Sequence, residues 1–200
     1  MPRNSTFTTE DFLRSATALI ADKGPEGATT AAILREAKAP AGSFYYRFES
    51  RDALLGELWL SLVEQYQREF LFFLQKGDGL SAALFTPSWT RTHSLEARVL
   101  LLHSKRDFGP DKWPTNYVER AQKLSSELRT GLRKYAKTYC GGNAEAIMQK
   151  VQFALIDVPY ASVRRYLSSG QSIPESVDVW VRDCFFTLQI ESGAGQRALN

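Results

Sequence analysis

Apolar residues recur at intervals of three and four along almost the whole chain, and this helical spacing limits the possible folds more than any other feature of the sequence. The clearest case runs from about residue 115 to residue 139, where one face of the segment is apolar over many turns. The alternation of apolar and polar residues that would indicate strands is not convincing anywhere. The spacing therefore predicts an all-α fold of about nine helices.

Capping residues, glycines and prolines divide this pattern into helices. Thr8 or Thr9 can cap a first helix, which Gly24, Pro25 and Gly27 then end. Pro159 lacks the N–H group that a helix needs, so we expect a kink at this residue. After the first helix we predict helices over 29–38, 41–48, 51–76, 94–106, 115–139, 144–167 and 175–190, with a short helix and a loop in 80–93 and a loop in 108–114.

The composition is that of an ordinary globular protein and excludes several classes of function. No apolar run approaches the roughly 18–20 residues of a membrane helix. The N-terminus also lacks the features of a signal peptide, so we expect a cytoplasmic protein with no membrane partner. Cys140 and Cys184 are too few and too far apart for a disulfide framework or a zinc site, and we expect no metal and no cofactor. The two histidines, His93 and His103, and the lack of catalytic motifs disfavour an enzyme.

Residues 29–48 fit the helix-turn-helix unit, which places a recognition helix in the major groove of DNA. Ile33, Leu34, Ala37 and Phe44 are spaced to pack inside this unit. Small residues on the outside let the backbone approach the groove, and hydroxyl groups can hydrogen-bond phosphate oxygens. The residues that we expect on this outer side are Pro40, Ala41, Gly42, Ser43, Tyr45 and Tyr46.

The run GATTAAILREAKAPAGSFYYRFESRDALL resembles the DNA-binding signature of the tetracycline-repressor (TetR) family of bacterial transcription regulators. The matching positions are Thr29, Thr30, Ile33, Ala37, Gly42, Phe44, Tyr45, Phe48, Leu54 and Leu55. The resemblance implies a helix-turn-helix domain in residues 1–50 and a helical domain in residues 51–200 for ligand sensing and dimerisation. It further implies a repressor that a small, largely apolar or aromatic inducer releases from its operator.

Two basic residues stand where the family has other residues. Lys38 replaces the turn glycine, which tolerates a left-handed backbone, so we expect local strain and a cation beside the groove. Arg51 replaces a lysine at the start of the fourth helix, where the resemblance implies a phosphate contact. The full set of candidate DNA contacts is Thr29, Thr30, Lys38, Pro40, Ala41, Gly42, Ser43, Tyr45, Tyr46, Arg47 and Arg51.

The charge balance alone does not indicate a DNA-binding protein. The chain has 25 Lys and Arg against 22 Asp and Glu, and residues 1–50 have six cations and six anions. Each protomer can therefore make only a few phosphate contacts, and we expect a homodimer on a palindromic operator of double-stranded DNA. A stripe of Arg129, Arg133 and Lys137 could form a second nucleic-acid surface, although such a stripe is usually a solvated helix face.

Many large aromatic residues lie after the helix-turn-helix unit, in a core that could also enclose a ligand. The carboxylate of Asp157, in an otherwise apolar helix, either pairs with Arg164 or Arg165 or faces the ligand. His103 and Asp107 are too few to hold a metal, and a capping or surface pair is the better interpretation. The candidate ligand contacts are Trp59, Tyr66, Phe70, Phe73, Trp89, His103, Trp113, Tyr117, Phe153, Asp157 and Tyr160.

The last two helices differ from the others because each is apolar on two sides, and such a helix must be covered on two sides. The second cover is either another copy of the chain, in a four-helix contact, or the rest of the same monomer. The candidate dimer residues are Ile147, Val151, Leu155, Val158, Val177, Trp180, Val181, Cys184 and Leu188. The opposite apolar side comprises Phe153, Ile156, Tyr160, Val163, Val179, Phe186 and Ile190.

A rival interpretation is a helical small-molecule or lipid-binding protein whose DNA-binding unit has degenerated. The neutral charge of residues 1–50 and the presence of Lys38 would permit it. Tyr45, Tyr46 and Arg51 favour DNA binding instead, because each can reach a phosphate oxygen.

Overall fold

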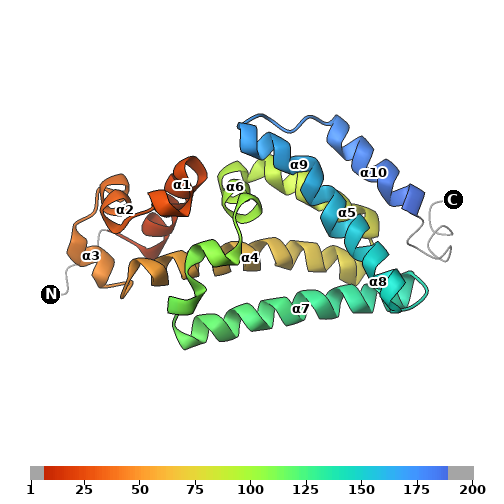
Figure 1. Cartoon of the computed structure of the whole chain (residues 1–200), viewed down its shortest axis with the longest axis horizontal. Coiled ribbons are helices and arrows are strands. Elements are labelled where there is room, and N and C mark those ends of the chain that lie inside the picture. The colour runs from red at the N-terminus through yellow and green to blue at the C-terminus, as the bar shows by residue number, and fades with distance from the viewer. Residues whose placement is uncertain (1–6, 189–200) are drawn as a thin grey trace. The chain divides into compact units, whose positions relative to one another are not determined.

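The computed structural model describes residues 7–188 and shows an all-α protein, with no strand in that range, as the spacing predicts (Figure 1). A π-helical turn, Phe153–Asp157, joins α8 to α9 without a break. When α8 and α9 are counted as one helix, the described residues contain nine helices. The helices are α1 (Thr9–Gly27), α2 (Thr30–Ala37), α3 (Ala41–Tyr45), α4 (Arg51–Lys76), α5 (Gly79–Thr92), α6 (Ser94–Leu102), α7 (Thr115–Tyr139), α8 (Glu145–Gln152), α9 (Val158–Ser169) and α10 (Ser176–Leu188).

The chain forms two compact units. The first unit contains the residues up to Val63 together with Leu95–Ala121, and the second contains Glu64–Ser94 and the residues from Gln122 onward. Helices α4 and α7 each begin in the first unit and end in the second. The functional division at residues 50 and 51 stays a prediction.

Side-chain caps explain where the first helices begin. The Thr8 hydroxyl accepts a hydrogen bond from the Asp11 N–H at 3.2 Å, and the Asp11 carboxylate accepts one from the Thr8 N–H at 2.8 Å. The Thr29 hydroxyl caps α2 by accepting from the Ala32 N–H at 3.2 Å. Helix α1 kinks at Gly24, where φ is 72°, and continues through Pro25 to Gly27.

Three aromatic rings form the core of the helix-turn-helix unit. Phe12 of α1, Phe44 of α3 and Phe48 are all buried. The ring centroid of Phe12 lies 5.6 Å from that of Phe44 and 6.4 Å from that of Phe48, both in edge-to-face geometry. Ile33 of α2 is also buried. The core thus fixes α3 through Phe44, as the sequence predicts.

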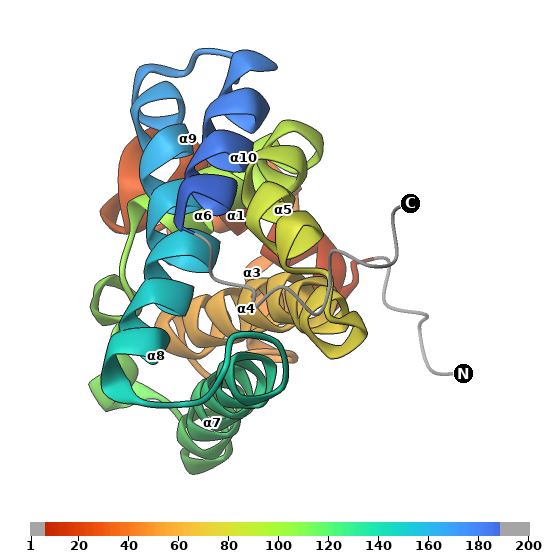
Figure 2. The same cartoon turned by 90° about the vertical axis from the view of Figure 1, so that its right-hand side faces the viewer.

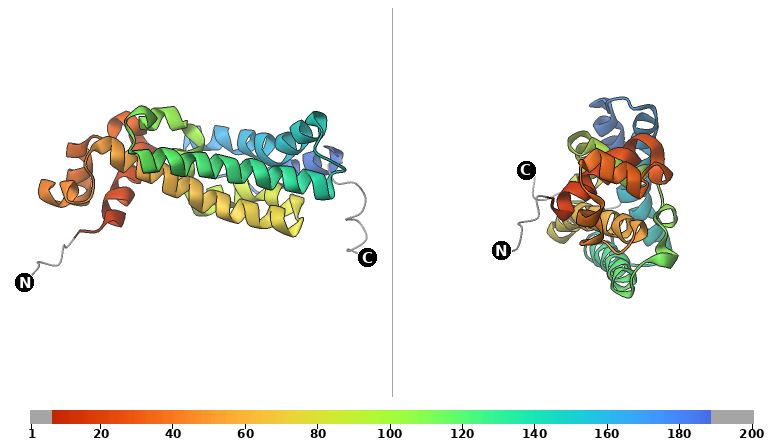
Figure 3. Two further views of the ribbon diagram at one scale, coloured as in Figure 1. Left: turned by 90° about the horizontal axis from the view of Figure 1, so that it is seen from below. Right: turned by 90° about the vertical axis from the view of Figure 1, so that its left-hand side faces the viewer.

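In the second unit, α5, α9 and α10 lie side by side (Figure 2). Helix α10 buries Val177, Val181 and Phe185 in this unit. The parts of α4 and α7 that belong to the second unit run close together (Figure 3). A β-carbon added to Gly131 of α7 would lie 2.5 Å from a methyl group of Leu71, so a glycine is needed at this approach.

The prediction of a short helix and a loop in residues 80–93 is wrong. Helix α5 is continuous from Gly79 to Thr92 and contains Pro87. A proline inside a helix removes one backbone hydrogen bond, so its presence in the sequence predicts a break in the helix. Here Phe85, Thr86 and Trp89 are buried, and this burial holds the segment helical despite the proline.

Two other boundaries also differ from the prediction. Helix α6 ends at Leu102, and the predicted loop after it contains two short 3₁₀ turns, Lys105–Phe108 and Pro110–Lys112. In place of a simple kink at Pro159, the helix widens into a π turn, in which the Val158 N–H donates to the Phe153 carbonyl. Pro159 cannot donate to the carbonyl four residues back, which explains why the regular pattern breaks there.

The sequence predicts no apolar segment long enough for a membrane helix. Within residues 7–188, no helix is both long enough and apolar enough to span a bilayer. Ile190 of the predicted last helix lies outside the described residues.

Candidate functional site

Helix α3 presents its predicted outer side to solvent. Tyr45 is 60% exposed and Tyr46 is 82% exposed. Pro40, Ala41 and Gly42 are exposed as well, and Ser43 is partly exposed. Phe44 points the other way and stacks edge to face on Phe12. The helix therefore carries two phenol groups on a small-residue surface over a rigid aromatic core.

Gly42 is not required by the packing of the protein. A β-carbon at this position would have no heavy atom within 4 Å, and the residue is not among those with positive φ. A glycine inside a helix costs about 1 kcal/mol relative to alanine. The bare backbone at Gly42 thus leaves space on the outer side of α3, where a close partner could approach.

Lys38 has the left-handed backbone that its place in the turn predicts. Its φ is 52° and its ψ is 34°, and it is the one non-glycine residue with positive φ in the range 7–188. Its N–H donates to the Arg35 carbonyl at 3.2 Å, and the next N–H, of Ala39, donates to the Leu34 carbonyl at 3.0 Å. This pattern closes the end of α2, and the side chain of Lys38 is exposed in the turn that leads to α3.

Arg47 is partly buried and lies against α3. Its guanidinium donates to the Ser43 carbonyl at 3.0 Å and lies 5.5 Å from the centre of the Tyr46 ring. This cation–π contact holds a positive charge beside the exposed tyrosine.

Arg51, the expected phosphate contact, is held by groups of the protein itself, and the phosphate contact stays a prediction. Its Nε donates to the Ala28 carbonyl at 2.8 Å, and its Nη2 donates to the Pro25 carbonyl at 2.6 Å. Its Nη1 lies 3.4 Å from the Asp52 carboxylate, which also pairs with Lys112 at 3.4 Å. The guanidinium is thus engaged by carbonyls at the end of α1, and Arg51 fastens α4 to the junction of α1 and α2.

Thr29 and Thr30 stand at the start of α2. The Thr29 hydroxyl is engaged as the helix cap, and Thr30 is partly exposed. The first turn of α2 contains no acidic residue, so the partial positive charge of the helix end is not neutralised within that turn. Such a helix end attracts phosphate groups.

Comparison with known families agrees with this geometry. Residues 12–58 match the model of the family described as bacterial regulatory proteins, tetR family. This part of the chain belongs to the tetR family. Curated proteins, by contrast, gave no match to the chain. The matched TetR domain begins at the buried Phe12 and ends at Leu58 of α4. It therefore includes α2, α3 and Arg51, which fastens α4 to the end of α1. The chain therefore carries the DNA-binding part of a TetR-type transcription regulator.

The candidate ligand residues fall into two separate groups. In the first unit, the Trp59 and Trp113 ring centroids are 5.8 Å apart, and the Trp113 indole donates to the Phe108 carbonyl at 2.8 Å. Tyr117 belongs to this group, and His103 lies beside Gly24, whose β-carbon position is 3.6 Å away. In the second unit, Phe70, Trp89 and Phe85 lie against Tyr66, and Phe73 lies against Phe85.

Three other candidate ligand residues do not lie in the interior. Phe153 and Asp157 are exposed, and Tyr160 is partly exposed. Because the carboxylate of Asp157 is exposed, it has no burial cost to offset. It therefore needs neither an arginine partner nor a ligand contact. The side chain of Arg164 hydrogen-bonds the Tyr160 hydroxyl. The sequence misplaced these residues because the helix is apolar on two sides and its spacing does not say which side faces inward.

His103 and Asp107 do not share a helix face, because α6 ends at Leu102, before both residues. The Asp107 carboxylate instead accepts a hydrogen bond from the Ser104 N–H at 2.6 Å and caps the turn Lys105–Phe108. This hydrogen bond lowers the pKa of Asp107, and the charge of His103 adds to the effect. The capping interpretation of Asp107 is confirmed.

Sequence reasoning missed a polar cluster around Glu57 in the first unit. The Arg120 guanidinium donates to the Glu57 carboxylate at 2.7 Å, and the Ser61 hydroxyl donates to it at 2.9 Å. Burial alone would raise the pKa of Glu57, but the hydrogen bonds from Arg120 and Ser61 outweigh it and hold the pKa below the ordinary value. Burial and the neighbouring Glu57 charge raise the pKa of Tyr117 to about 12. The separation of 63 positions between Glu57 and Arg120 left no sequence signal.

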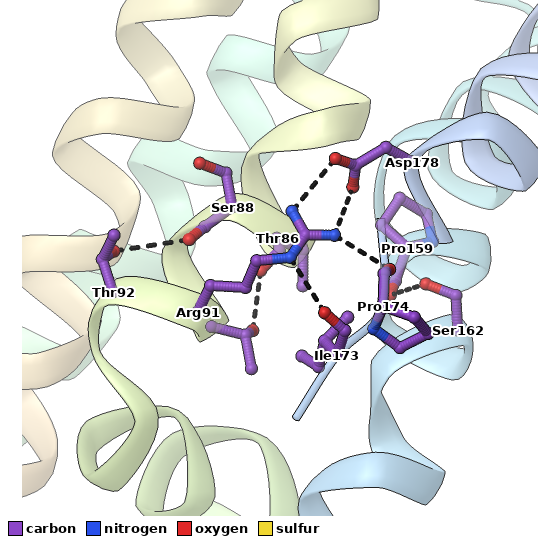
Figure 4. Close-up of polar contacts among 10 residues, drawn as sticks. Thr86, Ser88, Arg91, Thr92, Pro159, Ser162, Ile173, Pro174 and Asp178 are labelled. Carbon is purple, nitrogen blue, oxygen red and sulfur yellow. Dashed lines mark hydrogen bonds and ion pairs between the residues drawn. The ribbon is translucent and has the colours of Figure 1, made fainter. Parts of the chain in front are cut away.

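A second missed feature is the clamp formed by Arg91 at the end of α5 (Figure 4). Its guanidinium makes two hydrogen bonds to the Asp178 carboxylate of α10, at 2.9 and 3.0 Å. It also donates to the Ile173 and Pro174 carbonyls, at 3.2 and 3.1 Å. The bidentate geometry ties α5 to the start of α10 within the second unit.

The candidate dimer face needs a correction. Val151, Leu155, Val177 and Val181 are buried within the chain, so these four side chains are not available to a second copy. Ile147, Val158 and Leu188 are partly exposed, and Trp180 and Cys184 are exposed. The large apolar side chains that do reach solvent on α8–α10 and the π turn are Phe153, Val179, Trp180 and Phe186.

Proposed function

We propose that the chain is a homodimeric, ligand-responsive repressor that binds a palindromic operator of double-stranded DNA in the cytoplasm. The observation that carries the DNA-binding part is the outer side of α3, where Tyr45 and Tyr46 stand exposed within a matched TetR domain. Phenol groups reach phosphate oxygens, and the open space over Gly42 admits the edge of a groove.

The cations available near α3 support a binding mode with few phosphate contacts. Lys38 is exposed at the turn, and Arg47 lies against Tyr46. Arg51 is engaged with backbone carbonyls and does not add a third cation. Few contacts per protomer require two half-sites, about 34 Å apart, for useful affinity.

The outer surface of the last helices supports dimerisation. Trp180 and Phe186 of α10 are half exposed, and so is Phe153 of the π turn. Exposed apolar side chains gathered on neighbouring helices typically mark a protein interface. In a homodimer with a two-fold axis, this surface of one protomer would pack against the same surface of its partner, so that both are covered.

Ligand response is the third part of the proposal. The aromatic groups in both units are apolar and include a few polar atoms, which is the composition of small-molecule sites. An inducer shifts the population off DNA only if it binds the DNA-free conformation more tightly. Operator affinity measured with and without a saturating inducer must therefore differ, and equal affinities would contradict this part.

Selection of bound fragments from random duplex DNA tests DNA binding and symmetry together. We expect the full chain to enrich a palindrome and its affinity to fall as salt rises. Tyr45→Ala should weaken binding to the enriched sequence by at least about tenfold, while Phe72→Ala, which removes an aromatic ring of similar exposure outside the TetR domain, should leave it unchanged. If no sequence is enriched, the rival small-molecule or lipid-binding protein becomes the better explanation.

A further inference from the structure

An aromatic cluster in the second unit surrounds Tyr66 of α4. The Tyr66 ring centroid lies 5.0 Å from that of Phe85 and 5.2 Å from that of Trp89, both on α5. Phe70 stacks on Tyr66 at 6.3 Å, and Phe73 packs against Phe85 at 5.9 Å. Helices α4 and α5 thus build one continuous aromatic surface between them.

Two side-chain polar atoms of the second unit are buried without a hydrogen-bond partner among the described residues. One is the indole Nε1 of Trp89, a side chain that is only 2% exposed, and the other is the amide Oε1 of Gln67. A buried donor or acceptor that lacks a partner costs about 1–3 kcal/mol. Native proteins seldom accept this cost without a function or a bound molecule at the site.

A third polar group beside the cluster is the hydroxyl pair of Tyr66 and Thr86, whose oxygens are 2.6 Å apart. The pair shares one hydrogen bond but has two hydroxyl hydrogens, so one hydrogen is left to donate elsewhere. Burial raises the pKa of Tyr66 to about 12, and the phenol therefore stays uncharged at neutral pH. Tyr66 nevertheless keeps part of its surface accessible, which gives a molecule a side from which to approach the cluster.

We propose that this cluster binds an uncharged aromatic ligand, which accepts a hydrogen bond from Trp89 Nε1 through a carbonyl or hydroxyl oxygen. Gln67 follows Tyr66 in α4, and its unpaired buried Oε1 would accept a hydrogen bond from a donor on the same ligand. The neighbours of the cluster include the ring of His93, stacked on Trp89, and the hydroxyl of Thr86. Such surroundings disfavour a charged ligand, because a charge leaving water needs an opposite charge.

This inference rests on the proposed ligand response and names the chemistry of the ligand. It also gives a short structural route to the dimer surface. Trp89 and Arg91 are two residues apart on α5, and Arg91 holds Asp178 at the start of α10. A ligand that repositions Trp89 therefore acts on the helix that carries Trp180 and Phe186.

The test uses the full chain with ¹⁵N-labelled tryptophan, whose four indole groups give four NMR signals. Trp89→Phe identifies the signal of Trp89 by its loss. The probes are benzamide, which is uncharged with an acceptor and a donor, ethylbenzene, which has neither, and benzoate, which is charged. We expect a saturable shift of the Trp89 signal with benzamide. The Trp113 signal should stay in place, because that indole already donates to the Phe108 carbonyl.

The affinity of the matched variant completes the test. Trp89→Phe keeps a ring but removes the N–H, so it should bind benzamide about tenfold more weakly and ethylbenzene unchanged. No shift at Trp89, or equal shifts with benzamide and benzoate, would overturn the proposal. Operator binding is measured in parallel. A saturable Trp89 shift with no change in operator affinity would support the site and contradict only the regulatory role.

Discussion

At the scale of single residues, Lys38 combines a structural cost with a proposed role in DNA binding. Its φ of 52° is a conformation that costs a residue with a side chain on the order of 1–3 kcal/mol, and glycine has no such cost. The folded protein gains nothing visible from this side chain, which is exposed at the turn. A cation beside α3 is useful chiefly to a partner with negative charge.

We therefore expect Lys38→Gly to raise the free energy of unfolding by about 0.5–1 kcal/mol, since relief of strain exceeds the extra entropy of glycine in the unfolded chain. The same change should weaken operator binding and make it less sensitive to salt. Urea denaturation and operator titration measure the two effects. Lys38→Arg, which keeps the charge and the side chain, should match the wild type in both, and a stability gain for Lys38→Arg would contradict the strain argument.

Glu57 predicts how stability depends on pH. Its pKa in the folded protein lies below the ordinary value of 4.5, through the hydrogen bonds from Arg120 and Ser61. A carboxyl group with a lowered pKa adds stability that is fully present above pH 4.5 and is lost as the pH falls through the lower, folded value.

Glu57→Gln should therefore cost about 1–2 kcal/mol at pH 7, and this cost should shrink as the pH is lowered from 4.5 toward 3. Urea denaturation of both proteins at pH 7 and pH 3 gives the four free energies. Equal costs at the two pH values would mean that the Arg120 contact contributes no net charge effect.

Sequence reasoning predicted the exposure of Tyr45 and Tyr46 and the left-handed backbone of Lys38, but it missed the partners of Arg51, and the reason is physical. Exposure on a short helix follows from local spacing, and a left-handed turn residue follows from the local end of a helix. The partners of Arg51 are the carbonyls of Pro25 and Ala28, which are 26 and 23 positions away. Backbone carbonyls have no sequence signature, so only the folded chain shows this contact.

At the scale of elements, Arg51 makes the first turn of α4 a brace for the helix-turn-helix unit. Two backbone carbonyls at the end of α1 accept from one guanidinium, whose side chain is only 28% exposed. Asp52 extends the brace to Lys112 in the turn Pro110–Lys112. All of these groups lie in the first unit, so the brace positions α1 and α2 relative to α4.

Arg51→Gln separates this brace from a phosphate contact. We expect the variant to be about 1–3 kcal/mol less stable and to bind the operator more weakly, because glutamine cannot donate to both carbonyls as the guanidinium does. The slope of log affinity against log salt should not change, because no cation is withdrawn from a phosphate. Lys38→Gln is the control, and its slope should fall by about 0.9 for each phosphate that is no longer neutralised. A reduced slope in Arg51→Gln with unchanged stability would restore the phosphate contact.

Elements were predictable where local signals agree and unpredictable where tertiary burial decides. Helices α4 and α7 have a single apolar face, and α4 was predicted with its observed bounds, Arg51–Lys76. Helix α5 was not, because Pro87 is a local signal for a break and the burial of Phe85, Thr86 and Trp89 overrides it. The candidate ligand site at Tyr66 depends on this helix, so sequence alone could name the aromatic residues and not group them.

At the scale of the whole molecule, the two apolar sides of α8–α10 pose one question, namely which side a second copy covers. Sequence spacing found both sides and left open which of them faces a partner. The inner side carries Val151, Leu155, Val177 and Val181, which the second unit buries, and this leaves the opposite side for a partner. In the proposed homodimer each protomer offers few phosphate contacts, so dimerisation through this side would also strengthen operator binding.

Phe186→Glu tests this surface against a matched control. Phe186 is 57% exposed on α10, and Phe72 is 54% exposed on α4. The two substitutions therefore replace rings of similar exposure with the same carboxylate. A carboxylate at the centre of an apolar interface loses its water, and we expect Phe186→Glu to weaken the dimer by at least about 100-fold, with operator affinity falling in parallel. Sedimentation over a range of concentrations measures the dimer, and Phe72→Glu should sediment like the wild type. A Phe186→Glu protein that remains dimeric at wild-type concentrations would mean that the copies meet elsewhere, and the exposed rings of α10 would then need another partner.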